Sequence, residues 1–189
     1  MLSPADRRVV ERQIGRPPTG AVAVAHRCPY GYPQVILTHP LHRQGAEFGV
    51  FPTLFWLSCP YLTAEVARVE SGGGVRRYED LLAVQPDLVC RYAEAHESYR
   101  RERAALLSPE ERGFLGKVGA LDRLQTGIAG LSNRQRVKCL HAHLAHFLAR
   151  GGNPIGESVA AELPALFCPP QRIMCAEGLT DIPASSCLP

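Results

Sequence analysis

Residues 20–60 read GAVAVAHRCPYGYPQVILTHPLHRQGAEFGVFPTLFWLSCP, and the class of fold can be inferred from them. Three runs within them, 20–26, 34–39 and 51–58, are rich in β-branched and aromatic residues, which are typical of strands. The sequence Pro-Tyr-Gly-Tyr-Pro between the first two runs favours a turn. The pattern predicts a small, three-stranded, antiparallel sheet near the N-terminus.

Helical patterns lie before this sheet and fill the chain after it. Ser3 and Ser108 are each followed by proline and then by acidic residues, the signature of a helix start. Gly72-Gly73-Gly74 predicts a break between helices. Further helices are expected over residues 63–71, 76–84, 86–107, 134–150 and 157–167. The chain is therefore predicted to be one α+β domain over residues 1–167. Residues 168–189, rich in cysteine and proline, are expected to form an irregular tail.

The composition is that of a globular protein. Hydrophobic residues make up 46% and charged residues 21%, so a core can form without disulfides. The net charge of +3 is small for a chain built to coat nucleic acid. No apolar run is long enough to cross a membrane, and the N-terminus lacks the apolar segment of a signal peptide. We therefore expect a cytoplasmic protein without a membrane partner.

The seven cysteines include no Cys-x-x-Cys pair. In a reducing compartment they are expected to be thiols, metal ligands or catalytic groups. Cys28 and Cys59 lie where predicted strands end, and Cys139 lies in the sequence RVKCLHAHLAH. If these three thiolates converge, they would bind zinc with a fourth ligand, or hold an iron–sulfur cluster. The alternative is that all three are inert core thiols, and the spacing does not decide between the two.

The helix predicted over 134–150 places several of these side chains by its periodicity. Leu144 belongs to the stripe expected to face the core, whereas Cys139, His143 and His146 share the neighbouring flank. Side chains stacked one turn apart can bind one ion. The alternative is a buried thiol beside solvent-facing histidines.

Three basic residues flank the cysteines: Arg27, Arg136 and Lys138. Positive charge beside a thiol favours the thiolate. The same residues could bind an anionic substrate, either a small molecule carrying a phosphate or the backbone of a nucleic acid. A solvated basic face is the alternative.

Three segments together resemble one known family. They are RCPYGYP at 27–33, FPTLFWLSCP at 51–60 and RVKCLH at 136–141, and Glu70 and the sequence Asn-Pro-Ile-Gly at 153–156 also fit. On these residues the chain is similar, over residues 5–160, to the bacterial family numbered 501 among domains of unknown function. The resemblance implies no established activity, and the cysteine-rich tail lies outside it.

The resemblance does give weight to particular positions. It implies that histidine replaces Cys59 in some relatives, and exchange between two good zinc ligands favours a metal there. His143 is not part of the family pattern. The positions that do match it are Cys28, Cys139, His141 and His146.

Three hypotheses follow from these observations. The first is a metal-binding protein, or a metalloenzyme acting on an anionic substrate, with Cys28, Cys59 and Cys139 as ligands and His141 or His146 completing the site. The second is a non-catalytic interaction module whose cysteines are structural. The third is a thiol enzyme with Cys139 as nucleophile and a nearby histidine as base. Whether the chain is an enzyme stays open at this point.

Overall fold

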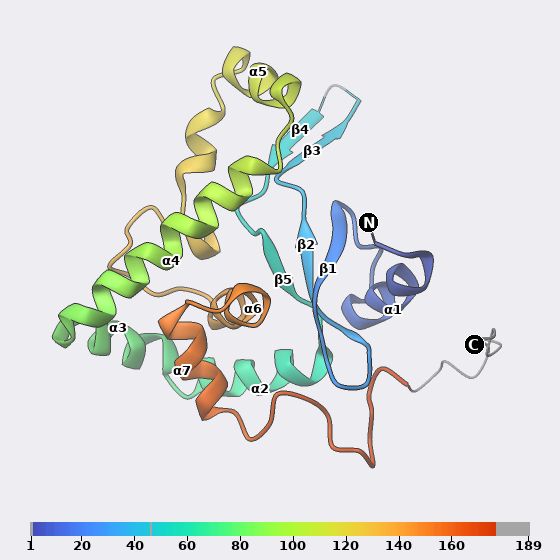
Figure 1. Ribbon diagram of the computed structural model, residues 1–189, viewed down its shortest axis with the longest axis vertical. Helices are drawn as coiled ribbons and strands as arrows, with labels where there is room; N and C mark the ends of the chain where they lie inside the picture. The colour runs from blue at the N-terminus through green and yellow to red at the C-terminus, as the bar shows by residue number, and fades with distance from the viewer. Residues whose placement is uncertain (1, 46, 177–189) are drawn as a thin grey trace, which may run out of the picture.

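The structure is a computed structural model, and it describes residues 2–45 and 47–176. Its centre is an antiparallel sheet in the order β1-β2-β5. The strands are β1 (Ala21–Arg27), β2 (Pro33–Thr38) and β5 (Phe55–Leu57). The predicted α+β class and the three-stranded antiparallel sheet are therefore confirmed (Figure 1).

The sheet separates two layers because side chains alternate along β2. Ile36 pairs with Trp56 of β5 and packs on Val10 of helix α1 (Pro4–Ile14). Val35, one residue earlier, belongs to the main core on the opposite face. Because successive side chains of a strand point to opposite faces of the sheet, β2 contributes to the cores on both sides. The start of α1 is as predicted, since the Ser3 side chain accepts a hydrogen bond from the backbone of Asp6.

Helices cover the other face of the sheet (Figure 1). The layer contains fully buried side chains such as Tyr92, Tyr99 and Leu144. None of the helices in the described part of the chain has the length and apolar character needed to span a bilayer. The helices of this layer are α2 (Pro60–Ser71), α3 (Gly74–Val84), α4 (Pro86–Ala105), α6 (Leu140–Arg150) and α7 (Pro154–Glu162), with a short 3-10 turn, η2 (Ile128–Gly130).

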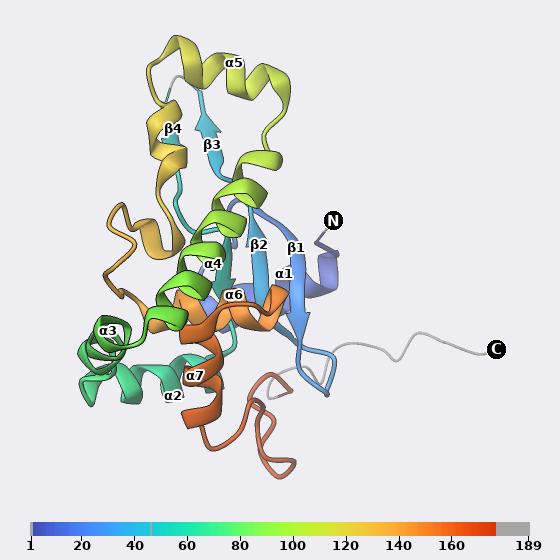
Figure 2. The same cartoon turned by 60° about the vertical axis from the view of Figure 1, so that its left-hand side comes forward.

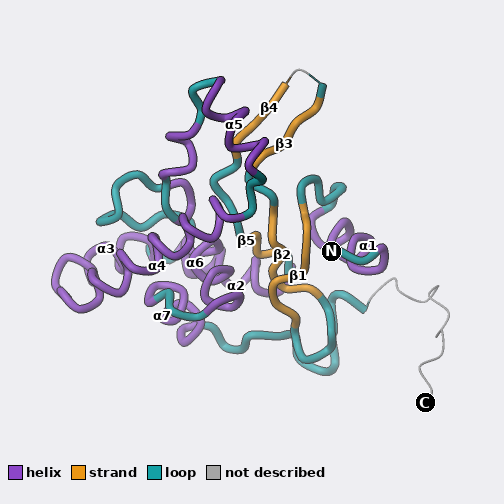
Figure 3. The backbone as a smooth tube through the Cα atoms, turned by 45° about the horizontal axis from the view of Figure 1, so that its top comes forward, coloured by secondary structure: helices purple, strands orange, loops and turns teal. Residues whose placement is uncertain are grey.

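A hairpin that the sequence pattern did not reveal extends beyond the sheet (Figures 2 and 3). It consists of β3 (Leu41–Gln44) and β4 (Glu47–Val50). Its Leu41 joins a small separate core with Leu115 of helix α5 (Pro109–Lys117) and Leu124 of the 3-10 helix η1 (Leu121–Gln125). Polar and charged residues dominate this stretch, so its alternation is too weak to predict strands.

The helix predicted over 134–150 begins only at Leu140, and this corrects the placement of Cys139. The backbone of Cys139 is left-handed, with φ 49° and ψ 84°, so its side chain does not lie on a helix flank with His143 and His146. The cause is tertiary. Glu79 accepts a hydrogen bond from the backbone N–H of Val137 at 3.0 Å, which holds the preceding residues outside the helix.

After α7 the described chain contains no further helix or strand up to residue 176. It runs beneath the turn between β1 and β2 (Figure 1). The side chain of Gln34 donates to the carbonyl of Leu166 at 2.6 Å, and the Tyr30 hydroxyl donates to that of Cys168 at 3.0 Å. The expectation of an irregular tail also covers residues 177–189, which lie outside the described residues.

Candidate metal centre

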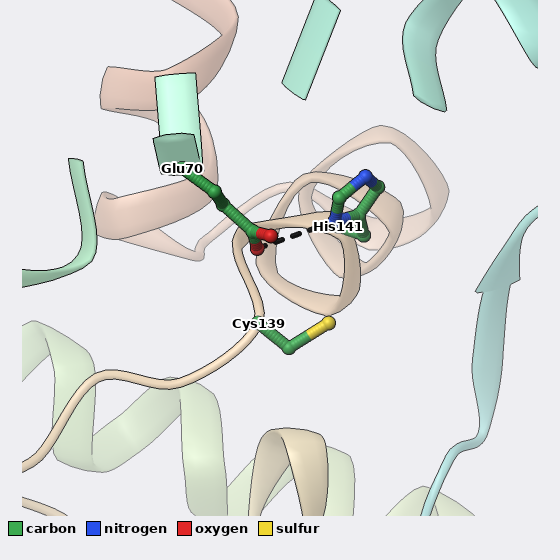
Figure 4. A group of neighbouring side chains, drawn as sticks. All are labelled: Glu70, Cys139 and His141. Carbon is green, nitrogen blue, oxygen red and sulfur yellow. Dashed lines mark hydrogen bonds and ion pairs between the residues drawn. The ribbon is translucent and has the colours of Figure 1, made fainter. Parts of the chain in front are cut away.

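Glu70, Cys139 and His141 form a group whose donor atoms all lie within 4.8 Å of one another. Glu70 reaches from the last turn of α2 towards the start of α6, where the other two residues lie (Figure 4). In the described residues, this is the one set of three such side chains that is compact enough to hold a metal ion. The sulfur, nitrogen and oxygen donors are each common zinc ligands.

Backbone contacts hold the group in place. The N–H of Leu140 donates to Glu70 Oε1 at 2.6 Å, so the Glu70 carboxylate caps α6 from a different element. Gly74 lets the start of α3 approach, since a Cβ there would lie 2.7 Å from Val69 and 3.1 Å from Leu140. Cys139, the N-cap of α6, is held in a backbone region that non-glycine residues rarely adopt. Cys139 thus lies at the positive end of the helix dipole.

Both nitrogens of the His141 ring have partners. Nδ1 lies 3.2 Å from Glu70 Oε1, and Nε2 lies 3.1 Å from the carbonyl oxygen of Thr63. Burial lowers the pKa of His141, but Cys139, the Thr63 carbonyl and Glu70 together raise it to about 9. The ring is therefore an imidazolium at neutral pH, beside a thiol and a carboxylate.

This arrangement fits a metal ion. A carbonyl can only accept, so Nε2 carries a hydrogen, and this is the outer contact that metal-binding histidines make. Nδ1 is then the nitrogen available as a ligand, and an ion there would replace its proton. Three protein ligands leave a further position open, as in catalytic rather than structural zinc sites.

The three-cysteine site expected from the sequence is wrong. Cys59 is the N-cap of α2, whereas Glu70 lies near the other end of that helix. At 1.5 Å per residue the two positions are about 16 Å apart along the helix axis. Neither Cys28 nor Cys59 joins the group around Cys139. An iron–sulfur cluster was expected only if these three thiolates converge. Since they do not, that expectation is not supported either.

Of the two histidines predicted as ligands, the structure brings only His141 to Cys139. His146 is buried, stacks on Phe55 at 5.7 Å between ring centroids, and lies 3.2 Å from the Asn153 side chain through Nδ1. Burial, followed by the charge of Arg150, lowers the pKa of His146 to about 4. It is thus a neutral core residue.

Two of the three predicted anion-binding residues already have carboxylate partners. Arg27 forms an ion pair with Asp6 at 2.7 Å, and Arg136 forms one with Glu79 at 2.6 Å. Lys138 is exposed and directly precedes Cys139. Binding of an anion by these residues stays a prediction.

Glu70 is the member of this group that spacing did not reveal. It lies 69 positions before Cys139 in the chain, and only the resemblance to the family pointed to it. A hollow of about 450 Å³ lies elsewhere, with Arg16, Thr38 and Trp56 in its wall, and none of the three grouped residues lines it. The grouped residues are instead half-buried between α2 and the start of α6.

The fold and this group define a small α+β protein with a mixed carboxylate, thiol and imidazole site. The chain belongs to the family described as protein of unknown function (DUF501), whose model matches residues 24–161. Glu70, Cys139 and His141 all lie inside the match, and the family resemblance expected from the sequence is confirmed. Comparison with curated proteins and with solved structures gave no match.

Proposed function

We propose that the chain binds one zinc ion through Glu70, Cys139 and His141 and uses the open position of that ion for chemistry. The observation that carries the proposal is that the three donor atoms lie within 4.8 Å of one another while Nε2 of His141 is held by the Thr63 carbonyl. Magnesium and calcium prefer oxygen ligands alone, whereas a thiolate with an imidazole selects zinc.

The residues of the chain have distinct tasks in this proposal. Cys139 supplies the softest ligand from a fixed backbone position, and Thr63 fixes the orientation of the His141 ring. When bound, zinc supplies a Lewis acid and lowers the pKa of a bound water to about 7. Glu70 balances the charge of the site while its Oε1 also accepts from Leu140, which ties the site to the helix.

An anionic substrate is the substrate class that this surface favours. Lys138 is exposed next to Cys139, and the N-terminus of α6 adds positive potential at the same place. Arg27 and Arg136 contribute less, because their charges are paired with Asp6 and Glu79. Replacement of Lys138 by glutamate is expected to weaken binding of inorganic phosphate by the zinc-loaded protein, without loss of zinc.

The test of the zinc proposal is the metal content of protein purified without chelator. C139S, H141A and E70Q should each lose one equivalent of zinc per chain relative to the unchanged protein. C90S is the matched control, since Cys90 is an exposed cysteine on α4. Unchanged zinc content in all three variants would refute the proposal.

One observation favours a second candidate, a thiol enzyme. His141 is protonated at neutral pH and lies beside Cys139, and a thiol next to an imidazole is the pair of groups that a thiol enzyme uses. Alkylation by iodoacetamide separates the two functions. A thiolate that binds zinc is protected until a chelator is added, whereas a catalytic thiolate reacts at the same rate with and without chelator.

A further inference from the structure

A second group of cysteines lies at the opposite end of α2 from Glu70. Cys59 caps the start of that helix, Cys28 directly follows β1, and Cys168 and Cys175 come from the segment after α7. Cys59 and Cys168 are 4% and 6% exposed, and the other two are half-buried. Four of the six described cysteines therefore come from segments that meet in one region.

Hydrogen bonds establish that these segments meet. The side-chain nitrogen of Gln13 donates to the Cys175 sulfur at 3.2 Å and to the Pro33 carbonyl at 2.7 Å. Tyr30, two residues after Cys28, bonds the carbonyl of Cys168 and packs its ring edge on Phe167. The segment after α7 is thus fixed against the end of the sheet by polar contacts.

A second set of contacts holds the same segment near Cys59. The backbone carbonyl of Gln34 accepts from the N–H of Cys59 at 3.3 Å, and the Gln34 side chain donates to Leu166 at 2.6 Å. One residue of β2 therefore links Cys59 to the segment that carries Cys168. This geometry brings both buried thiols to the same edge of the sheet.

The thiols also interact with one another electrostatically. Burial is the main cause that raises the pKa of Cys59 to about 11, and Cys175 and Cys168 raise it further. The pKa of Cys175 is raised by burial and by Cys168 and Cys28. Burial thus favours the neutral thiol at Cys59 and Cys175, and a soft divalent ion bound there would deprotonate both.

Local turns lie next to two of these cysteines. The N–H of Gly31 donates to the carbonyl of Cys28 at 2.9 Å, and Gly31 has a positive φ of 82° that this turn needs. A turn also precedes Cys175, with the N–H of Arg172 bonded to the carbonyl of Pro169 at 3.0 Å.

We propose that Cys28, Cys59, Cys168 and Cys175 form a second, all-cysteine zinc site that fastens the segment after α7 to the sheet. The site is structural, because four thiolates complete a tetrahedral shell and leave no open position. In the described residues no three of these sulfurs lie within 4.8 Å of one another, so the irregular segment 163–176 must close further on the ion. Residues 168 and 175 lie outside the family match.

The test compares zinc content of the full chain in matched variants. The unchanged protein should bind two equivalents, C168S and C175S one, and C139S also one, from the other site. The double variant C139S/C175S should bind none. C90S is again the control. If C168S and C175S keep the zinc content of the unchanged protein, the second site does not exist, and this result leaves the site at Cys139 untouched.

Cobalt replacement identifies the ligands independently of stoichiometry. The strong near-ultraviolet absorption of thiolate-bound cobalt should stay high in C139S, which keeps the all-cysteine site, and should fall to the level of a single thiolate in C175S, which keeps only the site at Cys139. A visible iron band in place of zinc, or a disulfide between any two of the four cysteines detected by intact mass, would overturn the assignment.

Discussion

Leu140 donates its backbone N–H to Glu70 at 2.6 Å, across 70 positions of sequence. This bond starts α6 and at the same time places a carboxylate beside Cys139 and His141. The side chain that caps α6 is therefore also the carboxylate of the proposed zinc site. A substitution at Glu70 can therefore change both the stability of α6 and the binding of metal, so the choice of the new side chain matters.

Two substitutions at Glu70 separate these roles. E70Q keeps an oxygen that accepts from Leu140 but loses the charge beside His141, so we expect a small loss of stability together with lost zinc. E70A removes the acceptor as well, so its loss should be larger and approach the roughly 1.5–3 kcal/mol of a hydrogen bond to a charged group. Urea unfolding of zinc-free protein measures the difference. Equal stability of E70Q and E70A would mean that the cap contributes nothing.

The inward face of α6 gives the second prediction. Leu144 is fully buried, and L144A should reduce the free energy of unfolding by roughly 2–5 kcal/mol. His143, which the sequence pattern placed on a polar flank, is equally buried and lies 3.2 Å from both Tyr92 and Asn153 side-chain atoms. H143A should therefore also be strongly destabilising, and K138A serves as an exposed control. A neutral H143A would contradict the buried placement of this ring.

The start of α6 shows where prediction from sequence reached its limit. Strands β1, β2 and β5 and the caps at Ser3 and Ser108 were predictable because their signals are local. The left-handed backbone at Cys139 was not, since Glu70 and Glu79 impose it from other helices.

The same limit applies to the functional residues. Spacing identified Cys139 and His141 as unusual but could not show that Cys59 lies at the far end of α2 from their partner Glu70. It also could not show that Asn153 provides a buried partner for His146.

Stability should depend on pH through three core histidines. Burial is the main cause that lowers the pKa of His96 and of His146 to about 4 each and that of His143 to about 3, against 6.5 in the unfolded chain. Below pH 6.5 these histidines become protonated in the unfolded chain, whereas in the folded protein they stay neutral until about pH 4. The folded state is therefore favoured above pH 6.5 and loses stability as the pH falls towards 4.

Urea midpoints between pH 4 and 7.5 measure this effect. H96Q removes one titrating ring, and its amide oxygen can still accept from the N–H of Ile128, as His96 Nδ1 does. The slope of stability against pH should be smaller in H96Q than in the unchanged protein. An identical slope in the two proteins would rule out His96 as a source of the dependence.

Packing of α6 against α7 gives the fourth prediction. A Cβ at Gly156 would lie 2.2 Å from the carbonyl oxygen of His143 and 2.6 Å from Cβ of Phe147. G156A must push the helices apart, which costs roughly 1–3 kcal/mol. Gly113, within α5, has open space around its Cβ position, so G113A should be neutral or stabilising by up to about 1 kcal/mol. Thermal unfolding of the pair tests this, and a stabilised G156A would show that the two helices are not in close contact.

The central claim is a zinc ion at the start of α6, and anomalous diffraction at the zinc absorption edge tests it most directly. Crystals of protein purified without chelator should give a peak near 2.3 Å from Sγ of Cys139, and about 2.0–2.2 Å from a nitrogen of His141 and an oxygen of Glu70. We expect this peak, with the Nε2 contact of His141 to Thr63 retained. Absence of a peak between these three residues in crystals soaked with zinc would contradict it.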